Sequence, residues 1–254
     1  MLNPRFNIYD NFLFDLDGTL WRWKYLLPGA KKVIADLYRA GKSVHFITNN
    51  TALPRAGYAA KLRAFGIKAR TEQIINPSLT AATLLKRKRV FVLSGGIKRD
   101  LRAAGIKVVE SKPQAVLIGE DMTLTFKKLA TAVEAVNEGA AVYKCAVGGT
   151  WLMGNMRWPG AGAIAAAVEI ATGEVGELIG KPSKYMLQEL KGLKLKRAIV
   201  VGDETYSDIE AGNALGWATA LVLTGNSSKE DAILARGDQK PDYVLNSVAD
   251  LLKK

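Results

Sequence analysis

The sequence predicts an α/β fold built on a parallel sheet, and three observations lead to this prediction. Short runs rich in β-branched and aromatic residues alternate with amphipathic helical patterns along nearly the whole chain. Two apolar runs far apart in the sequence, at 11–14 and 198–202, each lead into an aspartate. The middle of the chain carries its own alternation of strands and helices, which indicates a second, smaller α/β unit inserted into the first.

The elements can be assigned in chain order from their patterns. A helix is expected over 29–42, where apolar residues share one helical face and Gly41 ends the pattern. The clearest helix of the middle region is expected over 125–139. The core strands are expected at 11–14, 43–48, 197–203, 218–225 and 242–246, and those of the middle region at 89–96, 115–121 and 139–147. The boundaries of the inserted region are expected near residues 78 and 180.

Composition and targeting signals are typical of a soluble cytoplasmic protein. The chain has 254 residues, of which 48% are hydrophobic, and no apolar stretch reaches the ~20 residues that a membrane span needs. Cys145 is the only cysteine, so no disulfide can form within the chain, which fits a reducing compartment. The first residues lack the pattern of a signal peptide. We therefore expect a cytoplasmic protein without a membrane partner.

The net charge of +12 favours anionic ligands and also loose binding to nucleic acid. The densest basic cluster, at 86–89, follows a helical stretch and has no interleaved aromatic residues of the kind that stack on bases. We interpret this cluster as a solvated helix end that complements the helix dipole. No specific nucleic-acid partner is expected.

Polar side chains follow three of the expected core strands. Asp15 and Asp17 end the first, Thr48 and Asn49 end the second, and Asp203 follows a later one. Ligands of open parallel sheets bind beyond these carboxyl ends. Carboxylates gathered at one edge repel each other unless a cation lies among them, and hard oxygen ligands suit Mg²⁺. A calcium loop of the EF-hand type is excluded, since the glycine after Asp15 stands fourth instead of sixth and the twelfth residue is a leucine.

This pattern of side chains suits phosphoryl transfer. An aspartate at a strand end beside Mg²⁺ can attack phosphorus, and a second carboxylate two residues on can protonate the leaving oxygen and then activate water. Gly18 lets the chain turn sharply, and Thr19 is expected to fix that turn by a hydrogen bond. Donors for the phosphoryl oxygens are also needed, and candidates for this role are Thr48, the Asn49 amide and Lys181.

The strings DLDGTL, FITNN, GKP and GDETYSDI occur in this order and resemble the four motifs of the haloacid dehalogenase-like (HAD) superfamily. The resemblance implies that Asp15 is the nucleophile and Asp17 the general acid/base. It implies that Thr48 binds phosphate and that Lys181 neutralises charge on Asp15 and on the phosphoryl group. The implied activity is a Mg²⁺-dependent phosphatase that acts on a small phosphorylated metabolite through an aspartyl-phosphate.

The resemblance also implies a metal site and a domain organisation. Mg²⁺ would be held by Asp15, the carbonyl of Asp17 and Asp203, with Asp208 either a direct ligand or a support for the others. The long insertion between Thr48 and Lys181 has the position of a C2-type cap. The implied organisation is a Rossmann-like core, 1–78 and 180–254, interrupted by a cap domain, 79–179.

Within the superfamily the chain is similar to the NagD / p-nitrophenyl phosphatase-like branch, through TNN, the segment 159–173 and GKP. It departs from that branch in two places: AVGGTWLMG (146–154) stands where an Asn-x-Asp string is common, and Glu204 stands where arginine or a small residue is common. Both places bear on substrate choice, so the substrate does not carry over from the family.

Alternatives remain open at this point. The same fold can carry out phosphotransfer or dehalogenation, although the acid/base Asp17 argues against the latter because a halide leaves without a proton. A basic, non-catalytic nucleic-acid-binding protein is a third reading. Trp21 and Trp23 either shape a substrate entrance or pack beneath the cap. His45 and Cys145 are interpreted as packed residues.

An apolar cluster closes the inserted region. It consists of Trp151, Met153, Met156 and Trp158. Core packing is the favoured interpretation, over enclosure of the substrate and over a homodimer through the cap.

Overall fold

The computed structural model describes residues 1–153 and 156–253 and confirms the predicted α/β class, with two parallel sheets and helices around them. Contacts divide the chain into two units. The first comprises Met1–Thr48, Ala59–Ile74 and Leu187–Lys254, and the second comprises Asn49–Tyr58 and Ile75–Met186. Gly154, at the end of the unusual string 146–154, lies outside the described residues. The boundaries of the predicted cap, 79–179, stay a prediction.

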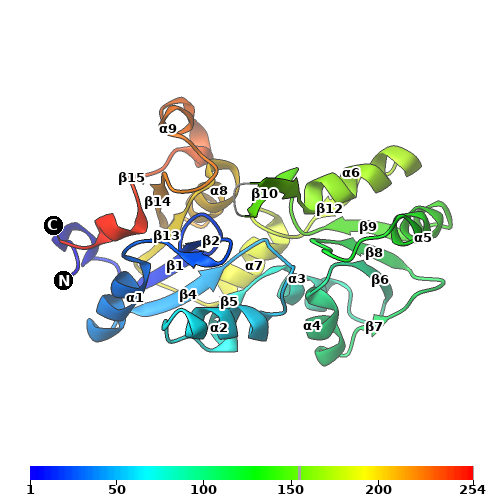
Figure 1. The fold of residues 1–254 in the computed structure, drawn as a ribbon, viewed down its shortest axis with the longest axis horizontal. Coiled ribbons are helices and arrows are strands. Elements are labelled where there is room, and N and C mark those ends of the chain that lie inside the picture. The colour runs from blue at the N-terminus through cyan, green and yellow to red at the C-terminus, as the bar shows by residue number, and fades with distance from the viewer. Residues whose placement is uncertain (154–155, 254) are drawn as a thin grey trace. The chain divides into compact units, whose positions relative to one another are not determined.

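The first unit is built on a six-stranded sheet in the order β15-β14-β13-β1-β4-β5 (Figure 1). Neighbouring strands from β15 to β4 pair in parallel. The order differs from the chain order because helical segments connect strands that are not adjacent, as is usual for parallel sheets. The strands are β1 (Asn11–Asp15), β4 (Ser43–Ile47), β5 (Ile74–Ile75), β13 (Ala198–Gly202), β14 (Ala218–Val222) and β15 (Tyr243–Leu245).

The central strand β1 is apolar because both faces of the sheet are covered. Phe12, Leu13 and Phe14 are fully buried, and β13 beside it is buried along its whole length. The register pairs Asp15 with Ile47 of β4 and Phe14 with Val201 of β13. The three strands therefore end at the same edge of the sheet.

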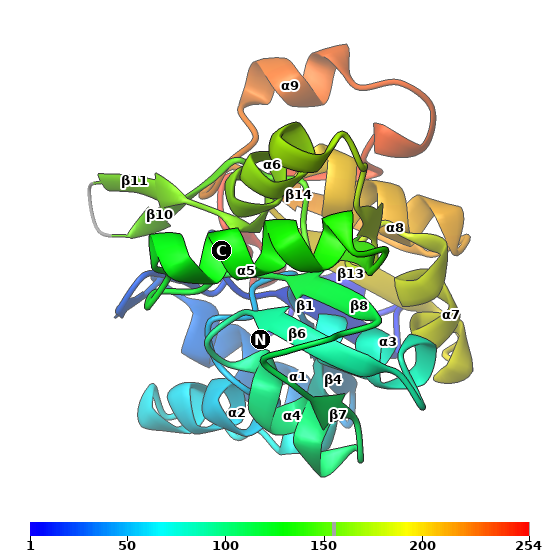
Figure 2. The same cartoon turned by 90° about the vertical axis from the view of Figure 1, so that its right-hand side faces the viewer.

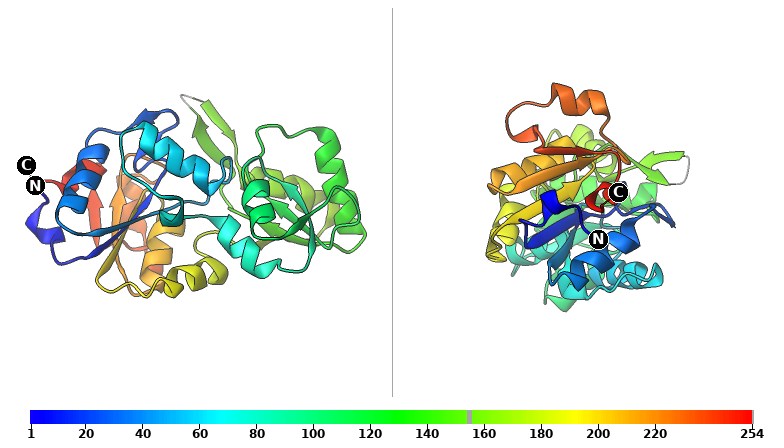
Figure 3. Two further views of the ribbon diagram at one scale, coloured as in Figure 1. Left: turned by 90° about the horizontal axis from the view of Figure 1, so that it is seen from below. Right: turned by 90° about the vertical axis from the view of Figure 1, so that its left-hand side faces the viewer.

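Among the described residues, five α-helices belong wholly or partly to this unit. The first buries Val33, Ile34 and Leu37, as the sequence pattern predicts, and the chain leaves it at Gly41, where φ is +71°. The two ends of the chain lie side by side, with a bridge between Leu2 and Leu252 (Figure 3). The helices are α1 (Ala30–Arg39), α2 (Arg55–Ala64), α7 (Lys184–Gly192), α8 (Glu210–Ala214) and α9 (Lys229–Leu234).

The second unit is built on a five-stranded, fully parallel sheet in the order β12-β9-β8-β6-β7. Its central strands coincide with the apolar runs of the middle region, whereas the two short edge strands were not expected. The strands are β6 (Arg89–Leu93), β7 (Lys107–Val108), β8 (Ala115–Ile118), β9 (Ala141–Lys144) and β12 (Glu177–Leu178). The helices are α3 (Pro77–Leu84), α4 (Ile97–Ala103), α5 (Phe126–Asn137) and α6 (Ala161–Thr172).

Alternate residues of these strands build two separate cores. Val90 and Val92 of β6 face α3 and α4, whereas Phe91 and Leu93 face α5 and α6. Figure 2 shows α5 and α6 on one side of the sheet and α4 on the other. The second unit therefore has its own hydrophobic interior on both faces of its sheet.

Two antiparallel hairpins were not expected from the sequence. One joins β2 (Trp21–Arg22) to β3 (Tyr25–Leu26), and the other joins β10 (Thr150–Met153) to β11 (Met156–Pro159). The second carries the four apolar residues at the end of the inserted region. The interpretation of these residues as core is wrong, because Met156 is 64% exposed and Trp151, Met153 and Trp158 are only partly buried. Among the described residues, no helix is both long enough and apolar enough to span a membrane.

Candidate active site

Three carboxylates meet at the carboxyl edge of the six-stranded sheet. Asp15 is the last residue of β1, Asp203 follows β13 directly, and Asp208 lies one turn later. One oxygen from each lies within 4.8 Å of the others, so a single cation could contact all three. They are at most 7% exposed. Burying three like charges together is unfavourable without a cation, and carboxylate oxygens are hard ligands, so this donor set fits Mg²⁺.

The Asp208 carboxylate is fixed by hydrogen bonds to the backbone that follows β13. Its Oδ2 accepts hydrogen bonds from the backbone N–H groups of Asp203 and Glu204, both at 3.1 Å. It lies on a single π-helical turn, Thr205–Ile209, of a kind that is frequent at functional sites. The short loop after β13 is therefore closed around the Asp208 carboxylate.

Two glycines allow the backbone to approach Asp203. Gly18 has φ +84°, and a Cβ at this position would lie 2.5 Å from Asp203 Oδ2. A Cβ at Gly225 would lie 1.9 Å from the same oxygen. The backbone N–H of Asn226 donates to this oxygen at 2.7 Å. Any larger residue at 18 or 225 would displace the Asp203 carboxylate.

Asp17 accepts a hydrogen bond that the sequence did not predict. The indole Nε1 of Trp21 donates to Asp17 Oδ1 at 2.8 Å, and Trp21 is fully buried. Trp21 is therefore an interior residue and does not border a substrate entrance. The metal role expected of Asp17 belongs to its backbone carbonyl and stays a prediction.

The prediction that Thr19 fixes the turn by a hydrogen bond is wrong. Thr19 Oγ1 is buried and has no hydrogen-bond partner among the residues that the structure describes. The turn is fixed by other groups: the Gly18 N–H donates to the carbonyl of Trp21 at 2.8 Å, and Thr224 Oγ1 donates to the carbonyl of Gly18 at 2.6 Å. A residue distant in sequence thus does what the adjacent threonine was expected to do.

The three expected phosphate-binding residues fall in two groups. Thr48 directly follows β4, at the edge where Asp15 and Asp203 lie, and is 2% exposed. Asn49 and Lys181 belong to the second unit and bind each other. Asn49 Nδ2 donates to the Lys181 carbonyl at 2.9 Å, and the Lys181 N–H donates to Asn49 Oδ1 at 2.7 Å. The Asn49 carboxamide therefore holds the backbone of Lys181, and the phosphate-binding roles stay predictions.

Glu204, a departure from the family pattern, is fixed by its neighbours. Ser207 Oγ donates to Glu204 Oε2 at 2.8 Å, and Asn226 Nδ2 donates to Oε1 at 2.5 Å. Burial and the adjacent Glu204 carboxylate raise the pKa of Tyr206, so this phenol stays neutral. The structure thus assigns Glu204 to a rigid polar group beside the carboxylate cluster.

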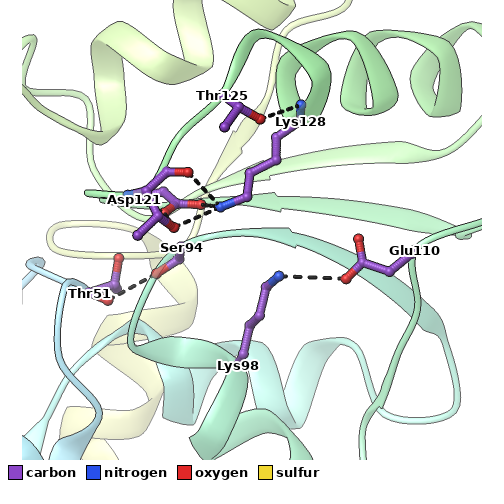
Figure 4. Close-up of polar contacts among 8 residues, drawn as sticks. Thr51, Ser94, Lys98, Glu110, Asp121, Thr125 and Lys128 are labelled. Carbon is purple, nitrogen blue, oxygen red and sulfur yellow. Dashed lines mark hydrogen bonds and ion pairs between the residues drawn. The ribbon is translucent and has the colours of Figure 1, made fainter.

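The second unit contains a buried polar group of its own, centred on Thr51. Its N–H and its hydroxyl donate to Glu120 Oε2 at 2.7 and 2.8 Å. Its carbonyl accepts from Ser94 Oγ at 2.9 Å (Figure 4). Nearby, Lys128 Nζ donates to Asp121 Oδ2 at 2.9 Å. The sequence did not predict this buried polar group, because single polar residues in an apolar strand pattern do not indicate one.

Cys145 is buried, as the sequence suggested, whereas His45 is only partly buried. His45 Nε2 lies 3.2 Å from Ser43 Oγ, and burial lowers the pKa of the imidazole. Burial raises the pKa of the Cys145 thiol well above its ordinary value, so it does not form the thiolate that a nucleophile needs.

A parallel α/β core with buried carboxylates at the carboxyl ends of β1 and β13 is the arrangement expected of a hydrolase that uses a strand-end aspartate. The chain matches the model of the haloacid dehalogenase-like hydrolases over residues 12–107 and a second HAD-hydrolase-like model over residues 178–251. Chronophin of Mus musculus is 36% identical, over 95% of this chain and 91% of that protein. The chain belongs to the haloacid dehalogenase-like hydrolases.

Solved structures agree with this assignment. A 4-nitrophenylphosphatase from Thermotoga maritima is similar with a TM-score of 0.87 and 29% identity, over 98% of both chains. A glycerol phosphate phosphatase from Mycobacterium tuberculosis, solved in complex with magnesium, has a TM-score of 0.90 and 29% identity, over 100% of this chain and 79% of that one. The predicted similarity to the NagD / p-nitrophenyl phosphatase-like branch is thereby confirmed.

Proposed function

We propose that this chain is a Mg²⁺-dependent phosphomonoester hydrolase that acts on a small phosphorylated metabolite through an aspartyl-phosphate on Asp15. The observation that carries the proposal is the convergence of Asp15, Asp203 and Asp208, buried and within 4.8 Å of one another at the end of β1. Several relatives and structural neighbours of the chain are phosphatases by name.

The proposed reaction has two steps. An Asp15 carboxylate oxygen forms a bond to phosphorus while the bond from phosphorus to the leaving oxygen breaks, and Asp17 gives that oxygen a proton. Asp17 then takes a proton from water, which attacks the same phosphorus and releases phosphate and the free Asp15 carboxylate. Asp15, the Asp17 carbonyl, Asp203 and Asp208 would hold Mg²⁺, which would supply positive charge to offset the charge of the phosphoryl group.

The remaining polar residues have proposed roles in binding. Thr48 and Asn49 supply hydrogen-bond donors to the phosphoryl oxygens, and Lys181 neutralises charge on them. The support for Lys181 is its burial at 2% exposure, which excludes an ordinary surface lysine, and the two hydrogen bonds that fix its backbone. The net charge of +12 attracts phosphorylated metabolites toward the protein.

Three further expectations belong to the same proposal. Residues 79–179 act as a C2-type cap that selects the leaving group. The partly exposed apolar hairpin β10–β11 supports a homodimer through this region, which light scattering can test. A cytoplasmic location is supported by the single cysteine, which is typical of proteins made for a reducing compartment.

The decisive experiment is the substitution Asp15→Asn, assayed with p-nitrophenyl phosphate and Mg²⁺. The amide is close in size to the carboxylate but is a poor nucleophile, so release of phosphate should fall at least ~10³-fold, to the background without enzyme. Asp231→Asn, on the exposed helix α9, is the control for loss of one carboxylate and should keep wild-type activity. Wild-type activity in Asp15→Asn would refute the mechanism. A screen of phosphoglycolate, pyridoxal phosphate, sugar phosphates and nucleotides would then identify the substrate.

A further inference from the structure

We propose that Trp21 is a positioning residue for Asp17, and that Lys61, placed over the indole ring, strengthens the hydrogen bond from Trp21 to Asp17. This inference rests on the proposed function, in which Asp17 gives a proton to the leaving group. It assigns roles to two residues outside the family motifs that carry the chemistry.

The first observation is the geometry between Asp17 and Trp21. The indole Nε1 of Trp21 donates to Asp17 Oδ1 at 2.8 Å, across a separation of four residues. The backbone of the same turn is doubly tied: the Gly18 N–H donates to the Trp21 carbonyl at 2.8 Å, and the Trp21 N–H donates to the Leu16 carbonyl at 3.1 Å. Side chain and backbone therefore fix Trp21 and Asp17 relative to each other.

The second observation is that the indole ring itself has little freedom to move. Trp21 is fully buried, and its ring lies 5.9 Å from the ring of Phe65, measured between centroids. An indole N–H can only donate, so its burial next to a carboxylate leaves one favourable arrangement. A carboxylate held through Oδ1 has its rotation about the Cβ–Cγ bond restricted, which keeps it ready for proton transfer.

The third observation concerns Lys61 on α2. Its Nζ lies 4.0 Å from the centroid of the Trp21 ring, well within the range of a cation–π interaction. Burial lowers the pKa of this lysine, while the negative charge of Asp17 acts in the opposite direction. A cation over the ring face withdraws electron density from the indole, which makes its N–H a stronger donor to Asp17.

The chemical consequence depends on the leaving group. An alkoxide needs a proton as it departs, whereas p-nitrophenolate is a stable anion that departs without one. A residue that orients the proton donor should therefore matter for alkyl phosphates and hardly at all for p-nitrophenyl phosphate. A residue that only supports the fold should affect both substrates equally.

The experiment compares kcat/KM for glycerol phosphate and for p-nitrophenyl phosphate, because kcat/KM reports the step in which the leaving group departs. Asp17→Asn is the reference and should lose about 10²- to 10⁴-fold on glycerol phosphate, with a much smaller loss on p-nitrophenyl phosphate. Trp21→Phe keeps a ring but loses the N–H. We expect a loss of roughly 10-fold on glycerol phosphate and less than about 3-fold on p-nitrophenyl phosphate.

Lys61→Met keeps the apolar stem of the side chain without its charge. It should show the same selectivity, with a loss of about 3-fold on glycerol phosphate. Lys61→Arg keeps a positive charge and should have wild-type kcat/KM on both substrates. The neighbouring pair Trp23 and Lys24 is the matched control, because Lys24 Nζ also lies over an indole ring, at 4.4 Å. Lys24→Met should leave the ratio of the two kcat/KM values at its wild-type level.

The outcomes separate this inference from the function on which it rests. Selective losses in Asp17→Asn but equal losses on both substrates in Trp21→Phe and Lys61→Met would overturn the inference and leave the function intact. Equal losses in Asp17→Asn itself would refute its role as the acid. Should Trp21→Phe fail to fold, as judged by circular dichroism, Lys61→Met and Lys61→Arg decide the question.

Discussion

Asp208 combines two tasks in one carboxylate. Its Oδ2 accepts from the backbone N–H groups of Asp203 and Glu204, and it also belongs to the cluster that could hold a cation. The two tasks can be separated by substitution. An asparagine keeps an oxygen that can accept the two N–H groups, whereas an alanine leaves both donors buried without a partner.

We therefore predict different outcomes for Asp208→Asn and Asp208→Ala. Both should weaken Mg²⁺ binding about tenfold or more, since each removes a negative charge from the site. Only Asp208→Ala should also lower the free energy of unfolding by about 1–3 kcal/mol, through the two unsatisfied donors. Urea unfolding and Mg²⁺ titration of the activity measure the two effects. Glu230→Gln, on exposed α9, controls for loss of charge. Equal stability of the two variants would contradict the structural role.

At the scale of elements, the segment 49–58 occupies the place where a ligand would bind in the second sheet. The chain leaves β6 toward β7 on one side and later enters β8 on the other, so the point between β6 and β8 is where the strand order reverses. Thr51, fully buried, lies at this point and binds Glu120 beyond β8 and Ser94 beyond β6. The crevice is thus filled by the protein's own chain.

Glu120 makes this anchor sensitive to pH. Burial raises the pKa of its carboxyl above the ordinary 4.5, although the hydrogen bonds from Thr51 act in the opposite direction. The folded protein therefore keeps a proton that the unfolded chain releases, and the contribution to stability is present below pH 4.5 and is lost as pH rises through the pKa of the folded state. The loss amounts to about 1.4 kcal/mol per pH unit within that window.

We predict that Glu120→Gln, which resembles the protonated acid, removes this pH dependence. The free energy of unfolding of the wild type should fall relative to that of the variant as pH rises above 4.5, and urea unfolding from pH 4 to 8 measures the difference. Glu138→Gln, at the exposed end of α5, should show no such trend. A difference between wild type and Glu120→Gln that stays constant with pH would show that folding leaves the pKa of the Glu120 carboxyl unchanged.

The main elements could be predicted from sequence because their patterns are local. The apolar runs at β1, β13 and β8 and the spacing in α1 and α5 require no knowledge of the rest of the chain. The edge strands β7 and β12 and the hairpin β10–β11 are short, so each depends on a partner that only the folded chain supplies. The exposure of Met156 could not be predicted for the same reason.

The site shows the same division. Asp15 and Asp203 could be predicted to meet, since parallel strands bring their carboxyl ends to one edge. Asp208 was implied only by the family resemblance, either as a ligand or as a support for the others. The hydrogen bond from Trp21 to Asp17 could not, because it depends on the path of one turn. The expectation for Thr19 failed because Thr224, far along the chain, makes the hydrogen bond to that turn instead.

At the scale of the whole molecule, the carboxylate cluster belongs to only one of two units. Asp15, Asp203 and Asp208 all lie in the first unit, while the second has its own sheet with apolar cores on both faces. A ligand that binds only the folded state stabilises the part of the protein that forms its site, by about 2.7 kcal/mol at a hundred times its Kd. Mg²⁺ should therefore not act evenly on the chain.

We predict that Mg²⁺ slows amide hydrogen exchange in β1 and β13 more than in β6 and β8. The central strands of each sheet exchange through opening of their own unit, so added stability should appear where the ligand binds. Hydrogen exchange with mass spectrometry measures this, with NaCl at matched ionic strength to remove the general effect of salt on a chain of charge +12. Asp203→Asn should lose the protection. Equal slowing in both sheets would mean that the two units open together, and slowing that persists in Asp203→Asn would place the cation elsewhere.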